Sequence, residues 1–128
     1  MLVEIHAPDA EGRVVTLREA LTVVWHGRRV EVPPGFASDG ASVPGCLQRL
    51  ISPPLDWRTL RAAVCHDYLY RCGQTRWSRR DADRLFRQLC CQDRLGRFRA
   101  LLAYWGLRLF GGVVWNRYAA LDRGSGKC

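Results

Sequence analysis

A change of residue pattern at the Pro-Pro-Gly turn of residues 33–35 constrains the fold of this chain more than any other feature. Proline cannot donate a hydrogen bond to a β-ladder, so no strand continues through this turn. His26-Gly27, earlier in the chain, predicts a hairpin turn between two strands. The segments before residue 33 are rich in β-branched residues and predict short strands at residues 2–6, 13–17, 21–25 and 29–32. The sequence therefore predicts a small N-terminal antiparallel β-sheet or hairpin.

The rest of the chain has the pattern of helices. Residues 36–45 are small and turn-forming and predict a loop, and Ser52-Pro53-Pro54 is a second break. Asp56 is the expected N-cap of the first helix. Ser78 and Asp81 resemble a capping box at the start of the second, with Asp in place of Glu. Three helices are expected, at residues 57–72, 78–94 and 97–118.

A length of 128 residues permits one α+β domain and argues against two independent cores. We predict one domain at residues 1–122 and a flexible tail at 123–128. The N-terminal segment lacks the basic and apolar regions of a secretory signal, so the expected location is the cytoplasm of the producing cell. The six cysteines include no CxxC pair, and in a reducing compartment buried thiols plus one exposed tail cysteine are expected. The domain divides into a β part at residues 1–35, a loop region at 36–56 and a helical part at 57–122.

The net charge of +8 makes nucleic-acid binding the first function class to consider. The sequence has no zinc-finger spacing, helix-turn-helix signature or RNP-type segment, and its arginines are scattered. A solvated basic surface is therefore favoured, with attraction to DNA, acidic lipid or an acidic partner as a consequence. Residues 100–116 are largely apolar but short for a membrane span and interrupted by Arg108. A core helix is favoured there, and a membrane-surface helix is the alternative.

His66 and Asp83 are the residues best placed for chemistry. Each is expected on the apolar face of its helix, where an imidazole and a carboxylate both need a polar partner. They lie at similar distances from the loop at residues 73–77, so an antiparallel pair of helices would bring them opposite each other. Such a pair orients the imidazole and raises its basicity, as a general base requires.

Asp67 and the loop at residues 36–45 supply further candidates. Asp67 projects about 100° from His66 around the helix. It could bind the backbone amides of the loop or share a calcium ion with the loop carbonyls. Ser42 is a candidate nucleophile beside the His–Asp pair, although no nucleophile elbow surrounds it. Asp39-Gly40 fits a tight turn, and Asp39 and Ser42 equally fit hydrogen bonds to the loop's own backbone.

A structural role explains the same residues. A buried His–Asp pair can serve only to fix two helices, and Asp83 has Arg79 and Arg87 four residues away on either side. Structural networks produce such clusters as well as active sites do. Catalysis and helix fixation therefore both stay open at this point.

Three motifs in the same order resemble a domain family of unknown function that is common in phages and prophages. They are PPGFASDGASVP at residues 33–44, HDYLY at 66–70 and SRRDADRLF at 78–86. The resemblance implies an α+β phage or prophage protein and implies no activity.

The His-Asp-x-x-Tyr pattern of residues 66–70 is similar to the catalytic helix of phospholipase A2 enzymes. This resemblance implies that His66 activates water, Asp67 binds calcium, Asp83 orients the histidine and Tyr70 supports the site with its phenol. The chain departs from that family at two alanines that stand where those enzymes usually have cysteines. It also lacks their glycine-rich calcium loop.

Two functions are therefore expected. The first is a phage- or prophage-encoded hydrolase of lipids or other esters, with His66, Asp83 and Tyr70 as catalytic residues and calcium at Asp67 as its one candidate cofactor. The alternative is a non-enzymatic virion or tail-assembly component, or a binder of a host protein, in which the His–Asp pair is structural. The expected location is the host cytoplasm or the virion. Nucleic acid and a membrane surface are the further candidate partners.

Overall fold

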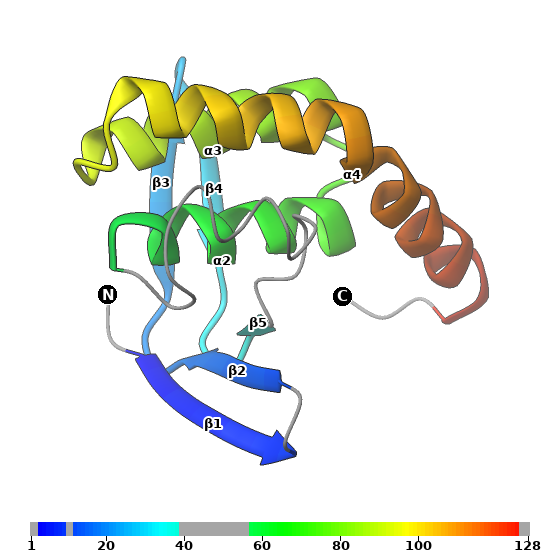
Figure 1. Ribbon diagram of the computed structural model, residues 1–128. Helices are drawn as coiled ribbons and strands as arrows, with labels where there is room; N and C mark the ends of the chain where they lie inside the picture. The colour runs from blue at the N-terminus through cyan, green and yellow to red at the C-terminus, as the bar shows by residue number, and fades with distance from the viewer. Residues whose placement is uncertain (1–2, 10–11, 39–56, 126–128) are drawn as a thin grey trace.

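A computed structural model describes residues 3–9, 12–38 and 57–125 of the chain (Figure 1). Within these residues, antiparallel strands come first and three helices follow, so the fold is α+β as predicted. The strands are β1 (Val3–Asp9), β2 (Gly12–Leu17), β3 (Leu21–Trp25), β4 (Arg28–Val32) and β5 (Ala37–Ser38). The helices are α2 (Trp57–Cys72), α3 (Arg79–Gln92) and α4 (Arg97–Ser125).

The described strands form two separate antiparallel units. β2 pairs with β1 on one side and with β5 on the other, and β3 pairs with β4 as a hairpin. The hairpin turns at His26-Gly27, where the backbone φ angles are 50° and 75°. Two positive φ angles match the right-handed twist of the flanking strands, so the predicted turn is confirmed. β5 lies inside the segment that the sequence predicts as a loop. Its two residues pair with β2 through backbone groups, and residue composition does not predict such pairing.

The β3–β4 hairpin contacts α3 through side chains near its turn. Its strands alternate buried and exposed side chains, and Trp25 is among those that face inward. The Trp25 indole N–H donates to Gln88 Oε1 at 2.6 Å. Arg28 pairs with Asp81 at 3.1 Å and lies 3.7 Å from the centre of the Trp77 ring. The turn end of the hairpin is therefore tied to both the first turn and the second half of α3.

The turn between α2 and α3 lies where the sequence places it. α2 ends before Gly73, whose amide donates to the Leu69 carbonyl at 3.0 Å. Ser78 Oγ accepts the amide of Asp81 at 3.1 Å and caps α3, as predicted. Asp56, the expected cap of α2, lies outside the described residues.

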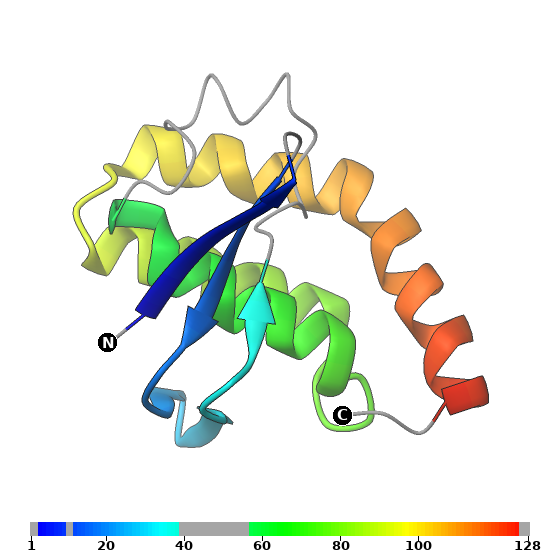
Figure 2. The same cartoon turned by 90° about the horizontal axis from the view of Figure 1, so that it is seen from below.

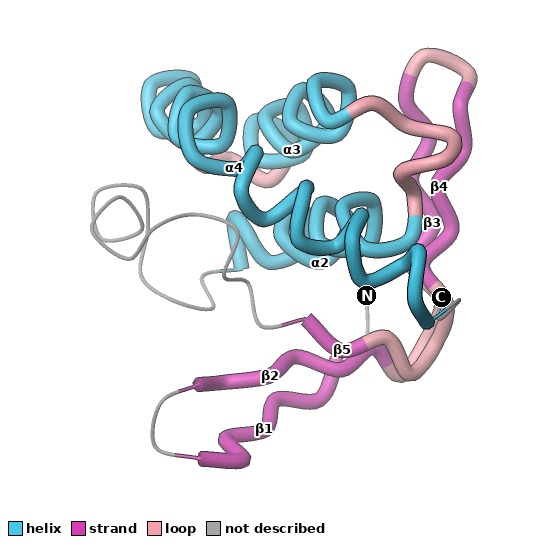
Figure 3. Tube along the Cα trace, turned by 90° about the vertical axis from the view of Figure 1, so that its right-hand side faces the viewer, coloured by secondary structure: helices cyan, strands magenta, loops and turns pink. Residues whose placement is uncertain are grey.

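α2 and α3 run antiparallel, and α4 packs on both of them (Figures 2 and 3). Arg61 near the start of α2 makes two hydrogen bonds to the Asp93 carboxylate at the end of α3, at 3.0 and 3.1 Å. Buried side chains of the three helices and of the hairpin form a common core. This arrangement places the middle of α2 opposite the middle of α3.

α4 continues to Ser125, so the expected helix end at residue 118 is wrong. Ala119, Ala120 and Leu121 follow the last buried turn, and all three are strong helix formers that propagate a helix without core contacts. The apolar residues 100–116 lie inside this helix. Among the described residues, no helix combines the length and apolarity that a membrane crossing requires.

Candidate functional site

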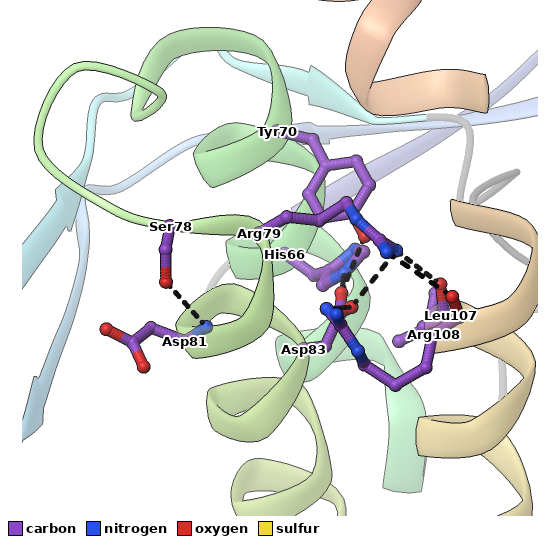
Figure 4. A network of polar contacts seen from close by, with 8 residues as sticks. All are labelled: His66, Tyr70, Ser78, Arg79, Asp81, Asp83, Leu107 and Arg108. Atoms are coloured by element: carbon purple, nitrogen blue, oxygen red, sulfur yellow. Dashed lines mark hydrogen bonds and ion pairs between the residues drawn. The ribbon is translucent and has the colours of Figure 1, made fainter. Parts of the chain in front are cut away.

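A buried polar network joins α2, α3 and α4 around the Asp83 carboxylate (Figure 4). His66 Nε2 lies 2.8 Å from Asp83 Oδ1, and the Tyr70 hydroxyl donates to the same oxygen at 2.6 Å. The Asp83 and His66 side chains are 0% and 1% exposed. The structure therefore brings together the histidine, the aspartate and the tyrosine that the sequence singles out.

The second carboxylate oxygen faces two arginines. Arg108 of α4 donates to Asp83 Oδ2 at 3.0 Å, and Arg79 of α3 lies 3.6 Å from the same oxygen. Arg79 also donates to the backbone carbonyls of Leu107 and Arg108, at 2.9 and 3.3 Å. Of the two arginines expected beside Asp83, Arg79 is present, whereas Arg87 lies over the Tyr104 ring. We call His66, Tyr70, Arg79, Asp83 and Arg108 the Asp83 network.

The proton positions in the network follow from its partners. Burial raises the pKa of the Tyr70 phenol far above its usual range, and the negative charge of Asp83 raises it further. The phenol therefore stays protonated and donates to Asp83. Asp83 also accepts from Arg108, whereas Arg79 lies at ion-pair distance. An ionised carboxylate can only accept, so His66 Nε2, which lies 2.8 Å from Asp83 Oδ1, is the ring nitrogen that donates. In the neutral imidazole, Nδ1 is then the nitrogen with the free lone pair.

A buried charge is costly unless it is paired and hydrogen-bonded. Asp83 meets this condition with donors from α2 and α4 and an ion pair within α3. The Arg79 guanidinium additionally ties α3 to the backbone of α4. The network can therefore fix the relative positions of three helices.

Two adjacent glycines let α4 approach this network. A Cβ atom on Gly111 would lie 2.6 Å from Tyr70 Oη, which is closer than van der Waals contact permits. A Cβ on Gly112 would lie 3.8 Å from the Arg79 guanidinium carbon, which is an ordinary contact. In the sequence alone, Arg108 counts only against a membrane span. Arg108 lies one helical turn before the two glycines of an otherwise apolar segment, and this pattern could have indicated a close polar contact.

Asp67 lies on the side of α2 that faces β5. Its side chain is buried, and Arg71 NH1 lies 4.0 Å from its Oδ2. Arg71 also donates to the Ala37 carbonyl of β5 at 2.9 Å. The other expected members of this region, Asp39, Gly40 and Ser42, lie outside the described residues.

The described part of the chain contains no group of three or more His, Cys, Asp or Glu residues that could hold a metal ion. Calcium takes about 6–8 oxygen ligands. Asp67 supplies one carboxylate beside a guanidinium, so the described residues do not by themselves fit calcium. The calcium site stays a prediction.

The cysteines differ from the expected set. Cys65 and Cys90 are buried thiols, as predicted, but Cys91 is an exposed thiol and Cys72 is disulfide-bonded. The expectation of free thiols came from the number of cysteines and the expected compartment, which apply to all six alike. Disulfide formation depends instead on which sulfur atoms the fold brings together. Burial raises the pKa of Cys65 and of Cys90 to about 12, which leaves them as unreactive thiols at neutral pH.

Alkylation of the native protein with iodoacetamide at pH 8 should therefore label Cys91 and spare Cys65 and Cys90. The thiolate is the reactive species, and both buried thiols are protonated and screened from the reagent. Fragment mass spectrometry can separate the adjacent Cys90 and Cys91. In denaturant all three should react, and labelling of Cys65 or Cys90 at the native rate of Cys91 would contradict the burial described here.

A model of a family described as "Protein of unknown function (DUF1353)" matches residues 15–107, which is more than half of the chain. The match contains all of α2 and α3 and the first part of α4. It therefore includes every member of the Asp83 network except Arg108, which follows its last residue. No curated protein and no solved structure shows a significant match to the chain.

Proposed function

The chain belongs to the DUF1353 family of proteins of unknown function, and on that premise we propose that it is a non-enzymatic component. We propose further that a phage or prophage encodes it, because of the motif resemblance of residues 33–44, 66–70 and 78–86. In this proposal, the Asp83 network is structural. It holds α2, α3 and α4 in one arrangement, and the protein acts through the surface that these helices present. Virion proteins, tail proteins or a host protein are the candidate partners.

The observation that carries the proposal is the complete enclosure of Asp83. The carboxylate is 0% exposed and is in contact with His66, Tyr70 and Arg108, with Arg79 at ion-pair distance. A general base must reach its proton directly or through one water molecule. The His66 side chain is 1% exposed, so it does not offer that access in this structure.

Charge supports the same conclusion. In a His–Asp pair that activates water, the carboxylate stabilises the imidazolium that forms. Here the negative charge of Asp83 is already shared by two guanidinium groups at 3.0 and 3.6 Å. An imidazolium at His66 would be a third positive charge around one carboxylate. The arrangement is therefore better suited to fixing the helices than to a His66 that takes up a proton during catalysis.

A hydrolase is the second candidate, because one observation favours it. The Asp83 carboxylate holds His66 by Nε2 and leaves Nδ1 as the basic nitrogen, while Tyr70 donates to the same carboxylate. These are the roles that the resemblance to phospholipase A2 enzymes implies. Calcium bound at Asp67 belongs to this second candidate.

Replacement of His66 by glutamine distinguishes the two functions. We expect wild type to release no more product than His66→Gln from a short-chain ester or from phospholipid vesicles, with calcium or with a chelator. We also expect His66→Gln to lower the free energy of unfolding by about 1–3 kcal/mol, because a buried partner of Asp83 is lost. Turnover that disappears in His66→Gln at an unchanged melting temperature would establish the hydrolase instead.

A further inference from the structure

α4 is apolar on two opposite faces. Its inner face packs on α2 and α3 with fully buried side chains, among them Ala100, Ala103 and Leu107. Four large apolar side chains follow a second line at spacings of seven, four and four residues, which places them on one side of a helix. They are Phe98, Trp105, Leu109 and Val113, which are 73%, 55%, 72% and 69% exposed. We call these four residues the outer stripe.

An exposed apolar line of this length is unusual, because a globular helix normally has a polar outer face. α4 lies at the outside of the helical layer (Figure 3). Scattered single apolar residues on a surface need no explanation, but a contiguous set marks a contact site. The outer stripe therefore indicates a partner that covers it.

The charges beside the stripe are all of one sign. Between residues 97 and 121 the sequence has four arginines and no aspartate or glutamate. Arg97, Arg99 and Arg117 are exposed. At 100° per residue, Arg97 lies on one flank of the stripe, and Arg99 and Arg117 lie on the other. A partner that complements this surface therefore has an apolar region bordered by negative charge.

A second copy of the chain does not fit this description. A two-fold contact places the same patch on both sides. The flanking arginines of one copy would then approach those of the other, and like charges at an interface are unfavourable. No acidic residue of the helix between residues 97 and 121 is available to offset them.

We propose that the outer stripe of α4 binds an anionic lipid surface, with the helix lying in the membrane interface. Such helices carry tryptophan, phenylalanine and leucine on the inserted face and arginine beside it. The four stripe side chains offer no hydrogen-bonding group other than the Trp105 indole, so little in them would fix the register of a folded protein partner. A fluid apolar phase requires no such register.

This inference rests on the proposed function, because the Asp83 network holds the inner side of α4. Arg79 binds the carbonyls of Leu107 and Arg108, and Arg108 binds Asp83. Trp105 and Leu109 lie within three residues of this anchor on the opposite side of the helix. The network therefore presents the stripe on a rigid body, and its binding needs no catalysis.

The test is sedimentation of the full chain with vesicles of phosphatidylcholine alone or mixed with phosphatidylglycerol. We expect binding to the anionic vesicles that falls by roughly tenfold or more in the double variant Trp105→Gln and Leu109→Gln, because two large apolar side chains leave the lipid. The double variant Arg97→Gln and Arg99→Gln should lose roughly fivefold per arginine and become less sensitive to salt. Val24→Gln is the matched control, because Val24 is 65% exposed on β3 and should not affect binding.

Three results would overturn the inference. The first is wild-type binding to neither kind of vesicle. The second is equal loss in Val24→Gln and in the stripe variant. The third is a dimer in solution that the stripe variant dissociates, because a second copy would then cover the stripe. Fatty-acid release from the same vesicles that His66→Gln abolishes would overturn the proposed function and leave lipid binding in place, so the two failures are distinguishable.

Discussion

Asp83→Ala should lower the free energy of unfolding by about 3–5 kcal/mol, because removal of one partner leaves buried charges without compensation. The substitution leaves Arg79 and Arg108 against an apolar interior and leaves the Tyr70 hydroxyl without its acceptor. The two arginine side chains keep 22% and 25% exposure, so they recover part of their hydration. The expected loss therefore lies toward the lower end of this range.

Urea unfolding followed by circular dichroism measures this loss. Asp81→Ala is the matched control, because Asp81 lies two residues away on α3 and its pair with Arg28 is partly exposed. Exposed pairs contribute less than about 1 kcal/mol. Asp83→Asn keeps the shape of the side chain and provides a milder variant if the alanine variant does not fold. A loss at Asp83 no larger than at Asp81 would show that the network does not stabilise the helices.

Gly111→Ala should destabilise the protein by about 1.5–5 kcal/mol, although alanine is the better helix former by about 1 kcal/mol. The added Cβ would lie 2.6 Å from Tyr70 Oη, so the phenol or α4 must move. Tyr70 is buried and donates to Asp83 at 2.6 Å, and its ring is in contact with Trp115. Overpacking of this kind costs about 1–3 kcal/mol, and the lost hydrogen bond to a charged group costs about 1.5–3 kcal/mol more.

The adjacent glycine is the control for this prediction. Gly112→Ala places its Cβ at 3.8 Å from Arg79, so it should gain about 0.5–1 kcal/mol from helix propensity. Tyr70→Phe removes the atom that Gly111→Ala meets, so the double variant should lose less than the sum of the single losses. Equal effects at both glycines, or additive losses in this double-mutant cycle, would contradict the close approach.

Local chemistry made the elements predictable. The His26-Gly27 turn, the Ser78 cap and the stop at Gly73 depend on groups within a few residues of each other, and all three agree with the structure. The end of α4 depends instead on how far a helix propagates without core contacts, and there the sequence prediction stopped short. β5 needed a partner strand 20 or more residues away, so its own two residues carried no signal.

The facing pair His66 and Asp83 could also be inferred, because two helices joined by a short loop leave one simple way to pair their apolar faces. The contribution of the third helix, α4, could not be inferred. Arg108 is 25 residues from Asp83, and nothing in its local sequence states which helix its guanidinium meets. The same limit applies to Gly111, whose need for a small side chain exists only because Tyr70 lies across from it.

The sequence by itself determined the order of strands and helices, the turns between them and the presence of a polar pair on two apolar faces, because periodicity and capping act within one or two turns of chain. Tertiary packing alone decided that a third helix closes over that pair with Arg108 and that Asp83 is fully enclosed. It also decided that the opposite face of α4 is left apolar and exposed. Burial and charge pairing depend on which segments distant in sequence share one interior, and only the folded arrangement of α2, α3 and α4 specifies that.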